Sequence, residues 1–289
     1  MEQYGKFATN YIAGQGADRK DKRKEYRDRI TCVPNCNPDN GGPPYGSIAV
    51  LIGCIYCYIT YNVNAENGNV FKSLKNSEMM LEPELVGCGR QISSLFTYSF
   101  LHADLGHIVS NMTIMLLVWP LLELAHDSFR PLAVYVFGVM TGALCDLALS
   151  PDTNLVGASG GVYALMVAHL AIIIMNWREM DKKWLTIKSI ILAPLLLTAF
   201  YDVWKAFVRY GLGKDDMSRV SYAAHLGGTI TGLFFGVVIL RNYVEDNWER
   251  YFRIVSLTVY TGFLIWMYVL ATSHDFFCKD LEYTKLAGN

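Results

Sequence analysis

The sequence has few charged residues and lacks the spacings that bind a metal. Charged side chains make up 18% of the 289 residues and hydrophobic ones 52%, and the mean hydropathy is +0.23. This composition is more apolar than that of a typical soluble domain. None of the six histidines stands in the H-E-x-x-H motif of a zinc protease. The net charge of −1 conceals a basic cluster near the N-terminus, for which we expect a role in membrane topology rather than nucleic-acid binding. We therefore expect a multi-pass membrane protein that is not a zinc protease of this type.

The cysteines form no framework typical of a zinc site or a disulfide scaffold. There are seven, and Cys54 and Cys57 fall inside an apolar stretch rather than beside a βαβ pattern, which argues against a redox motif. Cys88 and Cys278 both fall on the side predicted to be non-cytoplasmic, where a disulfide is permitted. The sequence leaves that pairing open.

Seven apolar stretches are about long enough to cross a bilayer, which takes roughly 20 residues. They cover residues 46–63, 105–125, 132–150, 157–176, 184–204, 221–240 and 254–272. The expected fold class is therefore an all-α membrane protein. No inverted repeat of the kind found in transporters relates these stretches, which argues against a carrier.

A basic cluster before the first stretch sets the expected orientation. It consists of Arg19, Lys20, Lys22, Arg23, Lys24, Arg27 and Arg29. The positive-inside rule places this tail, residues 1–45, in the cytoplasm, and its polar, proline-containing sequence predicts partial disorder. We see no signal peptide, so the first apolar stretch is expected to act as the insertion signal. Seven crossings then put the short tail 273–289 on the non-cytoplasmic side.

A serine between glycines interrupts the fourth stretch, in the sequence VGASGGVYAL from Val156 to Leu165. Residues 151–154 (PDTN) predict a loop that ends where a helix begins. Ser159 would then lie near a helix N-terminus, where free N–H groups favour negative charge. An acyl-transfer oxyanion needs that environment. The alternative is that Gly157 and Gly160 only make a surface for helix packing.

Further intramembrane polar residues fall early in the second and sixth stretches. His107 and Asn111 are four residues apart and so share one helix face, and His225 opens the sixth stretch. With the N-terminus inside, the second, fourth and sixth helices all run from outside to inside. His107, Asn111, Ser159 and His225 are therefore expected at similar depth. Polar groups in a membrane are costly, which makes them candidates for function.

Stripes of small residues indicate which helices meet. The sixth stretch places three glycines on the face of His225, and the fourth carries a matching stripe. These residues are Gly228, Gly232 and Gly236 in the sixth, and Gly160, Ala164 and Ala168 in the fourth. Because such stripes let backbones approach closely, we expect the helix with His225 to pack against the helix with Ser159.

The residue types suggest acyl-transfer chemistry. A serine hydroxyl needs a base to become a strong nucleophile, and histidine is the usual base near neutral pH. We assign Ser159 as nucleophile and His225 as base, with Tyr163 packed against the imidazole. Asn111 and His107, together with the backbone N–H of Ser159, would donate hydrogen bonds to the oxyanion.

Several polar residues also allow other interpretations. Asn111 could be only an interhelical hydrogen-bonding residue, and we interpret His169, deep in the fourth stretch, as a packing residue. Asp146 and Asp202 raise the question of a catalytic triad. Tyr201-Asp202 followed by residues 211–215 (GLGKD) superficially resembles the YD and GxGD motifs of paired-aspartate intramembrane proteases. An extra residue in the second motif, and its position in a polar loop, argue against that class.

Together these motifs resemble those of the rhomboid family of intramembrane serine proteases. That family has H-x-x-x-N in its second helix, G-x-S-G in its fourth and A-H-x-x-G-x-x-x-G in its sixth. The matching residues here are His107 and Asn111; Gly157, Ser159 and Gly160; Ala224, His225, Gly228 and Gly232; and also Tyr163, Glu123 and the FLHA sequence from Phe100 to Ala103. The resemblance covers residues 46–272 and implies a six-helix rhomboid core plus one C-terminal transmembrane helix (6+1).

The resemblance also implies a function. Rhomboids of the animal secretase-type branch cleave single-pass proteins within or next to their transmembrane segments. They release ectodomains such as growth-factor precursors. The implied mechanism is a Ser-His dyad without a third acidic member, a metal or a cofactor. The implied partners are single-pass substrates and the lipid bilayer. The implied location is the Golgi, endosome or plasma membrane.

Two positions depart from the family pattern. Ser93 and Ser94 stand where a tryptophan-arginine pair is usual in the first outer loop, and Trp119 replaces a glycine four residues before Glu123. The first departure favours the alternative of a rhomboid-fold protein that binds membrane clients without cleaving them, although such proteins usually lose the serine or the histidine. A transporter or channel is a third possibility, supported only by scattered intramembrane polar residues.

Overall fold

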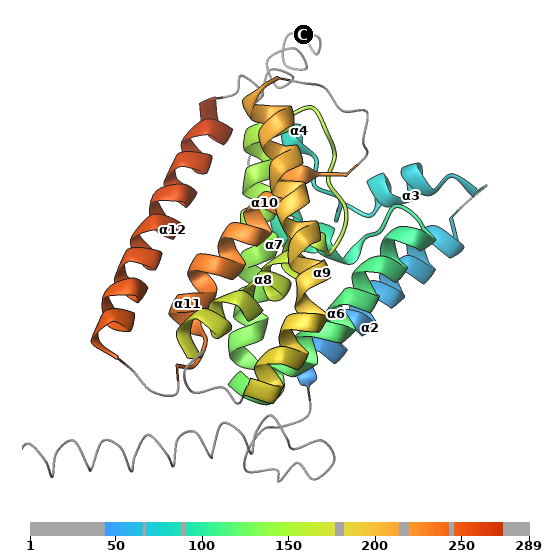
Figure 1. Cartoon of the computed structure of the whole chain (residues 1–289). Helices are drawn as coiled ribbons and strands as arrows, with labels where there is room; N and C mark the ends of the chain where they lie inside the picture. The colour runs from blue at the N-terminus through green and yellow to red at the C-terminus, as the bar shows by residue number, and fades with distance from the viewer. Residues whose placement is uncertain are drawn as a thin grey trace, which may run out of the picture.

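The chain folds into long helices that lie side by side (Figure 1). The computed structural model describes residues 44–65, 68–87, 91–176, 182–213, 220–242 and 246–273. Among these residues, six helices are long and apolar enough to cross a membrane. They are α2 with η1 (Tyr45–Val63), α6 (Leu105–His126), α7 (Phe129–Leu149), α8 (Ser159–Asn176), α10 with η5 and α11 (Tyr222–Ile239) and α12 (Asn247–Ser273). The protein is a multi-pass, all-α membrane protein, as predicted.

The predicted fifth crossing corresponds to α9 (Lys182–Ala206), which is not among those six. It is a continuous helix of 25 residues, about 37 Å long at 1.5 Å per residue, and it continues into a π-helical turn, η4 (Phe207–Gly211). A helix therefore stands at each of the seven predicted positions. The basic cluster, most of the tail 1–45, the tail beyond 273 and the pair Cys88 and Cys278 lie outside the described residues.

The start of the last helix differs most from the sequence prediction. Residue 254 was expected to begin it, whereas α12 begins at Asn247 and includes a charged first turn. The carboxylate of Glu249 explains the extension, because it accepts hydrogen bonds from the backbone N–H of Asp246 at 2.7 Å and from the side-chain amide of Asn242 at 2.6 Å. These contacts satisfy polar groups at the helix start, so the helix begins in the charged segment.

Helix α8 lies at the centre of the bundle. It contacts α6, α7, α9 and α10, and 83% of its span is buried inside the protein. Glycines make this possible, since a methyl group at Gly138 of α7 would lie 2.4 Å from the side chain of Ala164. The segment with the serine motif is therefore held from several sides.

Helix α12 packs on the outside of the bundle, next to α7 and η5 (Thr231–Phe235) (Figure 1). Only 17% of an 18-residue apolar window of this helix is buried. Its polar attachment is Tyr260, whose hydroxyl lies 2.7 Å from that of Thr141 and 3.3 Å from that of Thr231. Beyond its charged first turn, most of the exposed side chains of the helix are apolar, as a lipid-facing helix requires.

The loop segment between the first and second crossings supports the segment before α8. It contains α3 (Val70–Asn76), α4 (Pro83–Gly87), α5 (Ser94–Thr97) and η3 (Tyr98–Phe100). Leu81 forms an antiparallel bridge with Leu155, with both N–H···O distances close to 3 Å (3.1 and 3.0 Å). The Gly157 N–H also donates to the Tyr98 carbonyl at 3.1 Å. Backbone hydrogen bonds thus fix the chain just before Ser159.

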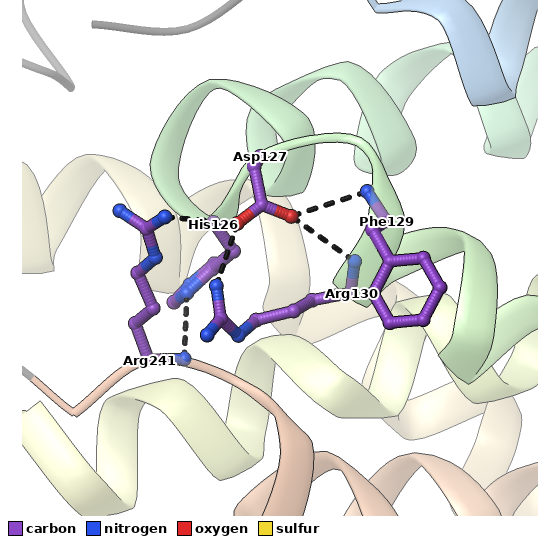
Figure 2. Close-up of polar contacts among 5 residues, drawn as sticks. All are labelled: His126, Asp127, Phe129, Arg130 and Arg241. Carbon is purple, nitrogen blue, oxygen red and sulfur yellow. Dashed lines mark hydrogen bonds and ion pairs between the residues drawn. The ribbon is translucent and has the colours of Figure 1, made fainter.

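A charged cluster connects the C-terminal end of α6, the start of α7 and the residues just after α11 (Gly236–Ile239) (Figure 2). The Asp127 carboxylate accepts from the side chains of Arg130 at 2.6 Å and Arg241 at 2.9 Å. Its other oxygen accepts from the N–H groups of Phe129 and Arg130 at the start of α7. The Arg241 N–H donates to the His126 ring at 3.0 Å. This cluster lies at the far end of α6 from His107.

Trp119, the departure from the family pattern in α6, is fully buried. Its indole stacks on the ring of Tyr135 in α7, with centroids 4.7 Å apart. The two rings fill the space between α6 and α7.

Glu123 of α6 caps the N-terminus of α2. Its carboxylate accepts from the Gly46 N–H at 2.8 Å and from the Ser47 hydroxyl at 2.7 Å, and it is buried. Helix α2 has no side-chain cap from its own N-cap residue, Pro44. Glu123 therefore supplies the acceptor that the free N–H groups of this helix need.

We expect Glu123→Gln to destabilise the fold. The amide has one acceptor oxygen and no charge, and hydrogen bonds to a charged group contribute about 1.5–3 kcal/mol. The thermal midpoint of the purified protein in detergent should fall. The same change at Glu84, which is exposed on α4, should leave the midpoint unaltered. Equal midpoints for the two variants would contradict the capping role.

Candidate active site

Helix α8 begins at the serine of the G-x-S-G motif. Its first hydrogen bond runs from the Val162 N–H to the Ala158 carbonyl, so the N–H groups of Ser159, Gly160 and Gly161 precede the hydrogen-bonded turns of the helix. Ser159 is only partly buried, whereas Gly160 and Gly161 are buried. The hydroxyl thus lies at the positive end of a buried helix dipole.

Gly157 places the His107 ring against this helix start. The φ of Gly157 is +125°, a conformation that side chains other than glycine rarely adopt. A methyl group there would also lie 2.7 Å from Nε2 of His107. The structure therefore brings the motif of the second helix next to that of the fourth. Position 157 needs glycine both for its backbone conformation and for the space that the His107 ring takes.

The two oxyanion candidates on α6 are held by local hydrogen bonds. The Asn111 amide donates to the His107 carbonyl at 2.9 Å, which leaves its second N–H for another acceptor. Nδ1 of His107 accepts from the Ala103 N–H at 3.5 Å. In a neutral imidazole that accepts at Nδ1, the proton is assigned to Nε2, on the side that faces Gly157.

His102, just before α6, packs edge-to-face on His107 with ring centroids 5.1 Å apart. It is fully buried. Burial, with a smaller effect from the nearby His107, lowers the pKa of His102 to about 3. His102 therefore stays neutral at physiological pH and adds no charge beside His107.

His225 lies in the first turn and a half of α10 (Tyr222–Ile230), and this helix start is also anchored by side chains. The Ser221 hydroxyl accepts from the Ala224 N–H at 3.1 Å and donates to the buried carboxylate of Asp146 at 2.5 Å. Asp146, which the sequence offered as a possible triad member, thus holds the N-cap of α10. Among the described residues, the carboxylate that bonds to the His225 ring is that of Asp202 instead.

The small-residue stripes meet, as their spacing predicts. A methyl group at Gly228 would lie 2.2 Å from the Gly160 carbonyl oxygen, and one at Gly232 would lie 2.3 Å from the Ala164 carbonyl oxygen. The backbones of α8 and α10 therefore approach to near contact at Gly160 and Gly228. Ser159 is one residue from this crossing on α8, and His225 is one turn from it on α10.

Tyr163 covers the imidazole of His225. The two rings are nearly parallel, at 13°, with centroids 4.0 Å apart. Because Tyr163 is one turn beyond Ser159 on the same face of α8, the stacking places the imidazole along the face that carries the serine. Within the described residues no hydrogen bond joins Ser159 to His225. Such bonds are often long before a substrate is bound.

Asp202 of α9 contacts both rings. Its Oδ2 lies 2.7 Å from Nδ1 of His225 and also accepts a short hydrogen bond from the Tyr163 hydroxyl. All three residues are buried. The resemblance implied a dyad with no acidic third member, whereas the structure has a carboxylate at the far nitrogen of the imidazole.

Other residues behave as the sequence suggests or add to it. His169 bonds to the Val118 carbonyl at 2.9 Å and is buried, in agreement with its interpretation as a packing residue. Tyr98 was not singled out, although it is fully buried beneath the motif and its hydroxyl donates to the Val139 carbonyl at 2.8 Å. No sequence signal other than its apolar surroundings pointed to it. Over the described residues, no group of His, Cys, Asp and Glu side chains is arranged to hold a metal ion.

Comparisons with known proteins agree with the motif pattern. Residues 89–242 match the family model described as "Rhomboid domain", a range that contains every candidate residue discussed above. The chain is 35% identical to Rhomboid-related protein 1 of Caenorhabditis elegans over 236 residues, and 32% identical to Rhomboid-related protein 3 of Homo sapiens over 261 residues. These matches cover 82% and 88% of this chain and 61% of each relative.

A further relative bears on activity. The chain is 28% identical over 239 residues to a Caenorhabditis elegans protein named Inactive rhomboid-related protein 2, a match that covers 82% of this chain and 63% of that protein. The chain thus spans about three fifths of the length of these relatives. The relatives that this chain resembles therefore include one whose name describes it as inactive.

Proposed function

Because this chain belongs to the rhomboid family, we propose that it is an intramembrane serine endopeptidase in which Ser159 is the nucleophile and His225 the general base. The observation that carries the proposal is the stacking of the His225 ring on Tyr163, one turn from Ser159, at the crossing of two glycine-lined helices. That arrangement confines the imidazole to the face with the serine. A packing interface alone would not need a buried histidine bonded to a carboxylate there.

The proposed reaction proceeds in two stages. In acylation, Nε2 of His225 takes the hydroxyl proton as Ser159 Oγ bonds to the scissile carbonyl carbon, and the carbonyl oxygen becomes an oxyanion. The C–N bond then breaks, and His225 gives its proton to the leaving amine. In deacylation, water gives a proton to His225 as it attacks the acyl carbon. The bond from that carbon to Ser159 Oγ then breaks, and His225 returns the proton to Oγ, which restores the serine hydroxyl and the neutral imidazole.

The proposed oxyanion site lies where α6 meets the start of α8. The Ser159 N–H, the second N–H of Asn111 and Nε2–H of His107 are the donors, and the dipole of α8 adds favourable potential. Preorganised donors of this kind each contribute about 2.7–4 kcal/mol to catalysis in serine proteases. Gly157, Gly160, Gly228 and Gly232 permit the close packing that positions them.

We further propose that the substrates are single-pass membrane proteins cleaved within or next to their membrane segment, with release of ectodomains such as growth-factor precursors. The N-terminal basic cluster supports a cytoplasmic N-terminus, which puts the starts of α6, α8 and α10 toward the outer face. Water could then reach Ser159 from that side. The Golgi, endosome or plasma membrane is the proposed location.

A fluorophosphonate probe tests the nucleophile directly. We expect the probe to label the purified chain at Ser159, identified by peptide mass spectrometry, and labelling should be lost in His225→Ala because the hydroxyl then lacks its base. The matched control is His169→Ala, which removes a different buried histidine, on α8 and away from the proposed base. This variant should retain labelling if it folds. Absence of labelling in the folded parent chain would contradict the proposal.

One relative's name, Inactive rhomboid-related protein 2, and the residues Ser93 and Ser94 keep a second candidate function open. The chain could bind membrane clients without cutting them. Capture of a single-pass client by the folded parent chain, with neither cleavage nor probe labelling, would favour this alternative.

A further inference from the structure

We propose that Asp202 is a positioning residue that holds His225 as a base, so that the site works as a Ser-His-Asp arrangement. The inference rests on the proposed function and adds a group on α9 to it. The observation that supports it is that Oδ2 of this carboxylate lies 2.7 Å from Nδ1 of His225 and also accepts a hydrogen bond from the Tyr163 hydroxyl.

The contact fixes which nitrogen of His225 is available. A carboxylate accepts only, so Nδ1 must carry a proton and donate it to Asp202. In the neutral imidazole, Nε2 then has the lone pair that can take the Ser159 proton. Rotation of the ring is opposed by this hydrogen bond at one edge and by the stacked Tyr163 ring on one face, 4.0 Å away.

The same contact stabilises the charged form of the base. When His225 has accepted the serine proton it is an imidazolium, and Asp202 is its nearest counter-charge. Both side chains are about nine-tenths buried, so little water screens the attraction. The proton on Nδ1 stays on the ring throughout, and the carboxylate remains ionised.

Asp202 also joins three helices. It extends from α9 to His225 on α10 and to Tyr163 on α8, and its partners are the base and the residue that covers the base. Lys205, one turn along α9, lies over the ring of Tyr222 at 5.8 Å. A carboxylate with only a packing role would not need to face Nδ1 of His225, the ring nitrogen that leaves Nε2 available to accept the serine proton.

The test compares Asp202→Asn with Asp152→Asn, an exposed carboxylate in the loop before α8, in a purified cleavage assay on a single-pass substrate. Asparagine has the same shape but no charge. It either presents its amide to Nδ1, which imposes the wrong tautomer, or leaves the imidazolium without a counter-charge. We expect kcat to fall by about 10²-fold or more with KM little changed, whereas Asp152→Asn keeps the parent kcat. An unchanged kcat for folded Asp202→Asn would overturn the proposal.

Proton NMR of histidine-labelled protein supplies a readout that does not depend on turnover. We expect a low-field Nδ1 proton resonance, assigned to His225 by its loss in His225→Ala, in the parent chain and in Ser159→Ala. It should vanish or move to higher field in Asp202→Asn. If the parent chain does not cleave, the proposed function fails, and this resonance alone decides whether Asp202 holds the ring. If Asp202→Asn does not fold, the absence of the resonance from the parent spectrum would overturn the contact.

Discussion

Ser159→Ala is expected to abolish cleavage of a co-expressed single-pass substrate while the amount of protein and its thermal midpoint stay at parent levels. The hydroxyl is partly exposed at the start of α8, and no hydrogen bond within the described residues depends on it. Its removal should therefore cost little stability. In soluble serine proteases, loss of the nucleophile lowers kcat by about 10⁶-fold, which places the expected activity below detection.

The matched control is Ser110→Ala. Ser110 is an exposed serine of α6 whose hydroxyl bonds to a carbonyl of its own helix, that of His107, at 3.0 Å. This variant removes a membrane-helix hydroxyl close to the site without touching the proposed chemistry, and it should cleave at the parent rate. Continued cleavage by Ser159→Ala, measured as the released ectodomain beside a mock-transfected control, would contradict a serine mechanism.

Much of the fold follows from the pattern of apolar residues. Helix α6 begins at Leu105, where its stretch was predicted to begin, because Asp104 caps it by accepting from the His107 N–H at 2.8 Å. Such local signals are visible in a sequence. The start of α12 was misplaced by seven residues because its first turn is charged, and the compensating contact to Glu249 comes from residues that precede the helix. Hydropathy alone could not reveal that contact.

In the candidate site, too, some contacts could be predicted from the sequence and others could not. Spacing on single helices predicted that the Gly228 stripe would face the Gly160 stripe, and that Tyr163 would reach His225, because each relation needs only helical periodicity and one helix crossing. To predict the contact of Asp202 with His225, one must also know how a third helix, α9, is oriented about its own axis. No residue spacing encodes that rotation, so Asp202 stayed one of two open candidates until the structure placed it.

The backbone contacts made by the loops could not be predicted from the sequence either. The pairing of Leu81 with Leu155 and the bond from Gly157 to Tyr98 join segments separated by more than fifty residues. They are backbone hydrogen bonds, for which side-chain identity carries little information. They nevertheless fix the chain at Gly157, and so they help to set the position of Ser159.

Gly228→Ala is expected to disable the protein by separating the two helices that carry Ser159 and His225. A methyl group there would lie 2.2 Å from the Gly160 carbonyl oxygen and 3.1 Å from Cβ of Tyr163. The nearest atom is backbone, so relief requires the helices to move apart. Overpacking of this kind costs about 1–3 kcal/mol. A displacement of about 1 Å at a catalytic pair lowers the rate by about 10²-fold.

Gly262→Ala provides the matched control, because it is the same change inside a helix, at a site with no atom within 4 Å of the new methyl group. Alanine is the better helix former by about 1 kcal/mol, so this variant should keep its activity and hold or raise its thermal midpoint. Gly228→Ala should show a lower midpoint and at least about 10²-fold slower cleavage. If the two variants behave alike in both measurements, the close crossing at Gly160 and Gly228 does not set the geometry of the site.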